Sequence, residues 1–191
     1  GEGENEGSCD PNRRVDLDMR HVNIRVAPGI QGHANAAIYE GLARGVEALA
    51  TGGTYMVADQ RYLPPLRGAE RNHASRLDYA MQVSGDLPSP GGYSLSGTII
   101  AEIDRTDYYI AQSKAITVSI SLKLRDNFNG VNIATIQEQQ VIPGSTKVYG
   151  GFPSSGFDNM PKVNLAPLFE KVEGALNAVL ACKPLRAVVL A

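Results

Sequence analysis

The side chains that could do chemistry are few and scattered along the 191-residue chain. The three histidines, His21, His33 and His73, form no H-E-x-x-H motif, and no cysteine or paired carboxylate stands beside them at metal-ligand spacing. The two cysteines, Cys9 and Cys182, lack the C-x-x-C spacing of a redox motif, and their sequence positions leave a disulfide between them open. The sequence therefore predicts no metal site and no cofactor.

Motifs for phosphate binding and nucleophilic catalysis are also missing. The residues Gly144–Lys147 have the letters of a P-loop in the wrong order, and no helix is predicted after them. There is no G-x-S-x-G nucleophile elbow. Glu102 and Asp104 are two apart on a predicted strand, so they share a face without forming an acid/base pair. We expect no catalytic residue and no enzyme activity.

One segment leaves a different function open. The irregular stretch 59–92 carries four arginines and an aspartate that folding could assemble around a phosphate or carboxylate group: Arg61, Arg67, Arg71, Arg76 and Asp86. Charges spaced along a loop more often form a solvated surface. The alternative function is therefore a small-ligand-binding protein or an enzyme with an arginine-lined loop site. A deep pocket with convergent polar groups would favour it, and a flat surface would favour protein docking.

Aromatic and amide side chains supply the candidate surface for binding another protein. Tyrosines near strand ends offer a large contact area and a hydrogen-bonding tip. The polar segment 133–142 has the composition of an edge strand and could accept a strand from a partner. The candidate partner-binding residues are Tyr93, Tyr108, Tyr109, Gln137, Gln139, Tyr149, Phe152 and Phe157.

Composition limits the class of protein that has to position these residues. The chain is 43% hydrophobic and 20% charged, which is typical of a globular domain. A net charge of −2 without a long basic run argues against nucleic acid as a partner. The apolar runs are far shorter than the roughly 20 residues that cross a bilayer. We expect a flexible tether over 1–19 and a single domain over 20–191.

Hydrophobic periodicity predicts the elements of that domain. Alternation with a period of two indicates strands, and a stripe repeating every three or four residues indicates a helix. The fold class is α+β (mixed α/β), with a central sheet of four to five strands and two helices packed on it. The predicted elements are strands over 20–27, 54–57, 95–103, 116–124 and 133–142, helices over 34–50 and 165–182, a short helix near 72–83, and a further strand over 185–190. The segment 143–164 is rich in glycine and proline and is predicted to be a functional or oligomer-facing loop.

Two short motifs and the order of elements resemble a known domain. Val57–Arg61 approximates a V-x-[DE]-R strand end, and Asp126–Gly130 matches a D-x-x-x-G hairpin turn. The chain over 20–182 is similar to the periplasmic domain shared by the curli-secretion lipoprotein CsgG, the penicillin-binding-protein activator LpoB and the amino-terminal domain of TolB. The tryptophan and serine that commonly follow the hairpin in that group are replaced here by 134–137, which leaves the subfamily open.

The resemblance implies a function without catalysis. It implies a bacterial cell-envelope accessory lipoprotein that acts by protein–protein docking, of the secretion or cell-wall-synthase-regulation type. The expected location is the periplasm, anchored to the outer membrane by a lipid that this chain does not carry. Because the chain starts without Met, we expect either a processed secretory protein or a trimmed chain, with any signal peptide or acylated cysteine removed. The expected partner is another envelope protein, with a homo-oligomer as a further possibility.

Overall fold

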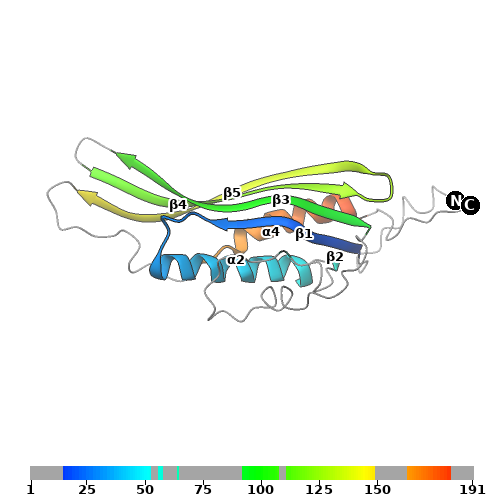
Figure 1. Cartoon of the computed structure of the whole chain (residues 1–191), viewed down its shortest axis with the longest axis horizontal. Coiled ribbons are helices and arrows are strands. Elements are labelled where there is room, and N and C mark those ends of the chain that lie inside the picture. Colours follow the sequence, from blue (N-terminus) through cyan, green and yellow to red (C-terminus); the bar gives the residue numbers. More distant parts are fainter. Residues whose placement is uncertain are drawn as a thin grey trace, which may run out of the picture.

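A computed structural model describes residues 15–52, 56–57, 64, 92–107, 111–148 and 163–181. Within them a five-stranded sheet in the order β2-β1-β3-β4-β5 carries two helices on one face (Figure 1). The elements are β1 (Val15–Val26), α2 (Gly32–Gly52), β2 (Met56–Val57), β3 (Tyr93–Asp107), β4 (Ala111–Asp126), β5 (Val131–Val148) and α4 (Ala166–Leu180). The predicted α+β class, with one helix after the first strand and another near the C-terminus, is confirmed.

The sheet is mixed because of its connections. Strand β1 pairs in parallel with both β2 and β3, and α2 connects β1 to β2. Strands β3, β4 and β5 form an antiparallel meander. Strand β3 therefore lies in the middle of the sheet, as the apolar character of both faces of the segment 95–103 predicts. Strand β5 lies at one edge.

Strand β1 begins at Val15, earlier than the predicted residue 20, so residues 15–19 belong to the sheet and not to the predicted tether. The register with β3 shifts by one residue between Asp18 and His21. Across this bulge the buried apolar side chains change from odd to even positions: Leu17 before it and Met19 within it are buried, as are Val22 and Ile24 after it. A strict alternation does not continue across such a shift, which is why the sequence pattern placed the start too late.

The Asp18 carboxylate stabilises the bulge. It accepts a hydrogen bond from the backbone N–H of Arg20 at 3.0 Å, and its second oxygen lies 2.7 Å from Nη2 of the same arginine. Asp18 is fully buried, so this paired guanidinium offsets the cost of burying a carboxylate.

The antiparallel strands are longer than predicted. Strand β3 runs to Asp107 and β4 starts at Ala111. Because β4 begins this early, β5 pairs with it as far as Val148, which lies opposite Ala111. The loop predicted over 143–164 is therefore wrong for residues 143–148. Proline lacks an N–H, but Pro143 is tolerated because it sits in an edge strand beside a register shift of β4.

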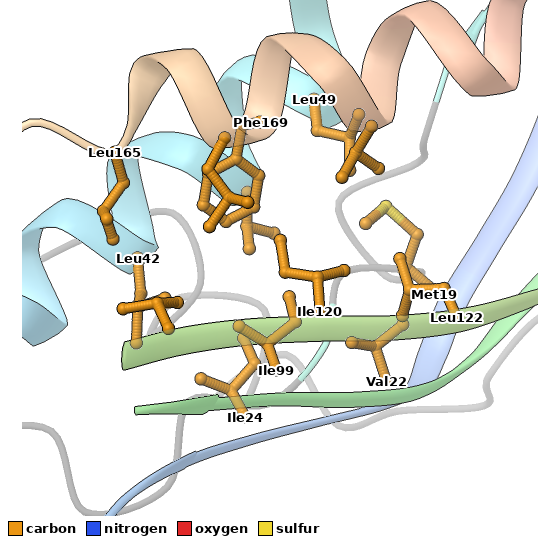
Figure 2. Packing of buried hydrophobic residues seen from close by; sticks show 14 of the residues in the cluster. Met19, Val22, Ile24, Leu42, Leu49, Ile99, Ile120, Leu122, Leu165 and Phe169 are labelled. Carbon is orange, nitrogen blue, oxygen red and sulfur yellow. The ribbon is translucent and has the colours of Figure 1, made fainter. Parts of the chain in front are cut away.

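Apolar side chains from the inner sheet face and both helices make one core. Figure 2 shows Ile24, Ile99 and Ile120 on the strands, on the side of the sheet that faces Leu42 of α2 and Phe169 of α4. All five side chains are buried. The opposite face of the sheet carries no helix among the described residues (Figure 1). Among the described helices, none combines the length and apolarity that a bilayer crossing requires.

Candidate functional site

Strand β5 forms a long edge of the sheet. It pairs with β4 along its 18 residues and is the last strand in the sheet order. Strands of globular domains usually have about five or six residues, so β5 is about three times the usual length. An edge strand presents a row of N–H and C=O groups that a further strand can bind.

The turn before β5 is fixed by the Asp126 carboxylate. This side chain accepts hydrogen bonds from the backbone N–H groups of Phe128 at 2.8 Å and Asn129 at 3.2 Å, and from Nδ2 of Asn129 at 2.8 Å. Gly130 closes the turn with φ +70°, a conformation that glycine adopts without steric cost. The D-x-x-x-G motif therefore has a structural role, which is to set where β5 begins.

The same turn is attached to the start of β3. The backbone N–H of Asn127 donates to the carbonyl of Gly92 at 2.9 Å, and its Nδ2 donates to Oγ of Ser94 at 2.6 Å. The ring of Phe128 meets the ring of Tyr93 edge to face, with centroids 5.9 Å apart. Tyr93 is 0% exposed, so the prediction that it binds a partner is wrong. Its position at the start of the central strand places the ring in the core.

The uncovered face of β5 carries an exposed row of three polar side chains followed by a valine: Thr135, Gln137, Gln139 and Val141. Gln137 pairs across the sheet with Ser121, and Gln139 with Ser119. A shallow hollow of about 410 Å³ is lined by these two cross-strand pairs together with Ile120 and Glu138. Gln137 and Gln139, predicted as partner-binding residues, are thus side by side on an accessible edge.

The helix-facing row of β5 is apolar at Ile136 and then becomes polar. Glu138 lies opposite the buried Ile120, and Gln140 lies opposite the buried Val118. Nε2 of Gln140 donates to the backbone oxygen of Asn164 at 2.9 Å, which connects β5 to the segment before α4. Oε1 of Gln140 is buried and accepts no hydrogen bond.

Charge is nearly absent from this edge. Along β5, Glu138 and Lys147 are the only charged side chains, and Lys147 lies one residue before the end of the strand. Natural edge strands are usually protected by charged residues, most often lysine. In contrast, β5 exposes Val131 by 49% and Val141 by 54%. An edge of this composition is typical of one that another strand covers.

Two other hollows lie at the helices. One, of about 680 Å³, runs between α2 and α4 and is lined in part by Glu47, Glu170 and Glu173. The second, of about 610 Å³, lies around the end of β1 and contains Tyr39, and burial raises the pKa of this phenol above its ordinary value. Within the described ranges, no three His, Cys, Asp or Glu side chains gather as a metal site requires.

The other predicted site residues lie outside the described residues. They are Tyr108, Tyr109, Tyr149, Phe152 and Phe157, together with Cys9 and Cys182 and the arginine group of the alternative function, Arg61, Arg67, Arg71, Arg76 and Asp86. The predicted helix near 72–83 and strand over 185–190 also lie there. Sequence reasoning missed Glu138 and Gln140 as a pair. Their spacing of two residues on a predicted strand was the available signal, since such residues share a face.

Comparison with known proteins finds similarity in solved structures alone. No protein-family model matches the chain, and no curated protein matches its sequence. The hypothetical protein CT253 from Chlamydia trachomatis matches with a TM-score of 0.44 and 13% identity over 89% of this chain and 99% of that one. The lipoprotein GNA1162 from Neisseria meningitidis matches with a TM-score of 0.34 and 15% identity over 86% and 97% of the two chains.

A third similar structure is a protein from Helicobacter pylori described as a neuraminyllactose-binding hemagglutinin homolog. It matches with a TM-score of 0.38 and 9% identity over 90% of this chain and 86% of that one. These three neighbours are bacterial proteins, one of them a lipoprotein.

Proposed function

We propose that this chain is a non-enzymatic accessory protein of the bacterial cell envelope, tethered there as a lipoprotein, that docks another envelope protein along the edge of β5. The docking mode is strand addition, in which an extended segment of the partner continues the sheet. The resemblance to the domain of CsgG, LpoB and TolB supports the envelope part of this proposal. The observation that carries the docking part is the long edge of β5 with its low charge.

Strand addition is favourable here because an added strand would do two things at once. It would form hydrogen bonds with the backbone N–H and C=O groups of the β5 edge, and it would bury the exposed apolar side chains of that edge. Backbone hydrogen bonds to β5 would supply affinity, and the side chains of alternate residues would supply specificity. Gln137 and Gln139 would neighbour the outward side chains of the added strand. The hydroxyl and amide groups of this face fit a partner that stays partly hydrated at the rim.

The test is photo-crosslinking in the native bacterium from a photoreactive amino acid at Gln139. A matched control carries the same group at Asn23, which is exposed on the same face of β1, three strands away from β5 in the sheet order. We expect an adduct of defined mass from Gln139 that contains one envelope protein, and none of that mass from Asn23.

A second arm changes the edge without changing the core. The double variant Gln137→Lys and Gln139→Lys adds the charges that protect natural edges and should abolish the adduct, with the crosslinker moved to Thr135. The single variant Asn23→Lys serves as its control and should leave the adduct intact. Equal crosslinking from both strands, or an adduct that survives the two lysines, would rule out docking along β5.

A further inference from the structure

The polar part of β5 indicates what kind of strand it accepts, an inference that rests on the proposed function. We propose that the partner segment is an extended, alternating strand of about ten residues with one arginine or lysine that faces Glu138 and Gln140. The remaining residues of the segment are uncharged. Hydroxyl or amide side chains lie on the open face of the sheet, and apolar side chains lie on the helix side.

Two acceptors without donors carry the inference. In the described part of the chain, the Glu138 carboxylate has no ion pair or hydrogen bond, and Oε1 of Gln140 is buried without a partner. Both belong to the helix-facing row of the same edge strand, because their partners across the sheet are the buried Ile120 and Val118. For the buried Oε1 of Gln140 the missing donor costs about 1–3 kcal/mol, whereas the half-buried Glu138 carboxylate keeps contact with water and would gain an ion pair from a cationic partner residue.

The geometry of a sheet puts one cationic side chain within reach of both. Residues two apart on a strand are about 7 Å apart along it. A residue directly opposite on an added strand has its Cβ about 5 Å away, and a long side chain also reaches the diagonal neighbour. Arginine suits this position best because its planar fork carries five N–H donors and stays charged.

The flanking residues define the rest of the partner segment. Ala134, Ile136 and Ile142 occupy the helix-facing row on either side of the two acceptors and are buried or half-buried against the core. Apolar residues of the added strand would extend this row. On the other face, Thr135 and Gln139 would pair with hydroxyl or amide side chains.

A second copy of β5 is a poorer occupant. Lys147, near the end of β5, is the only cation of the strand, so in a register centred on residue 138 a second copy would face Glu138 and Gln140 without a cationic side chain. Pairing in antiparallel register about residue 138 would also place two Glu138 side chains opposite each other, and like charges in that position are destabilising. A partner strand with a cation avoids both costs.

The experiment titrates full-length ¹⁵N-labelled protein with synthetic ten-residue peptides. The first peptide alternates threonine with valine and has arginine in place of a central valine. The second has glutamate at that position, and the third keeps the valine. Amide chemical shifts locate the binding site, and fluorescence anisotropy of labelled peptides gives the dissociation constant.

We expect shifts confined to β4, β5 and the start of α4, with the arginine peptide binding about tenfold more tightly than the glutamate peptide. The variant Glu138→Arg should reverse this preference. Glu102→Arg is the matched control, because Glu102 is an exposed carboxylate of β3 that lies away from the β5 edge. This control should leave the preference unchanged. A measured melting temperature for each variant excludes unfolding as the cause.

The outcomes separate this inference from the proposed function. Equal binding of the arginine and glutamate peptides, no shifts on β5, or a preference that survives Glu138→Arg would overturn the inference. None of these results would affect the crosslinking at Gln139, which tests docking itself. Light scattering of the protein alone that gives a multiple of 20.4 kDa, together with a Gln139 adduct to a second copy, would overturn the choice of partner.

Discussion

The ring of Phe169 on α4 lies against the backbone of Gly45 on α2, so closely that a Cβ atom at position 45 would be 2.2 Å from the ring carbon Cδ2. Both residues are buried, and Figure 2 shows the ring of Phe169 in the core under the two helices. Glycine is therefore required for packing here, although it lowers helix propensity by about 1 kcal/mol relative to alanine.

Gly45→Ala should lower the free energy of unfolding by about 1–3 kcal/mol, because the ring of Phe169 has to move out of a closely packed core. Urea denaturation followed by circular dichroism measures this change. Gly174→Ala is the control, since no atom lies within 4 Å of the added methyl group on α4. The control should stabilise the protein by about 0.5–1 kcal/mol, and the opposite order of stabilities would contradict the helix contact.

Gly97→Ala should destabilise the protein by at least about 2 kcal/mol. Gly97 has φ +132°, and a Cβ there would lie 2.1 Å from the backbone oxygen of Ser121 on the neighbouring strand β4. Gly32→Ala has φ +60° but open space around the methyl group, so it should cost about 1–2 kcal/mol. Thermal unfolding of the two variants measures the loss of stability in each. Equal losses would mean that the close contact with β4 does not contribute to the cost of Gly97→Ala.

Asp126→Ala should cost about 1–3 kcal/mol, because it removes the acceptor for two backbone N–H groups of the hairpin turn. Asp126→Asn keeps one side-chain oxygen and should lose less. Amide hydrogen exchange at 127–134 should accelerate in the alanine variant more than exchange at the far end of β5. Uniform acceleration along β5 would show that the turn does not set the start of the strand.

Stability should fall in alkaline solution because of Tyr39. Burial raises the pKa of its phenol above the ordinary value of 10.0. Above pH 10 the unfolded chain loses this proton while the folded protein retains it, so the contribution of Tyr39 is present below pH 10 and is lost as the pH rises. Urea unfolding between pH 8 and 11 should show a steeper decline for the parent protein than for Tyr39→Phe. Parallel curves would mean that the phenol is not perturbed.

Local patterns in the sequence determined most of the framework. The alternation of 116–124 predicted β4 because successive side chains of a strand point to opposite faces, and the stripe over 165–182 predicted α4. The polarity of 133–142 predicted an edge strand, and Asn129-Gly130 predicted the turn before it. The exposure of Gln137 and Gln139 follows from the same strand period, and their role in binding a partner stays a prediction.

The features that the sequence did not predict depend on pairing between residues far apart in the chain. The bulge after Asp18, the continuation of β5 through Pro143 to Val148, and the burial of Tyr93 depend on which strand lies alongside, and a short window of sequence does not contain that information. The buried Oε1 of Gln140 without a partner, and the position of Glu138 in the same helix-facing row, also became visible only in the folded sheet. Sequence periodicity specifies the face on which a side chain lies, whereas the tertiary structure decides whether that side chain has a partner there.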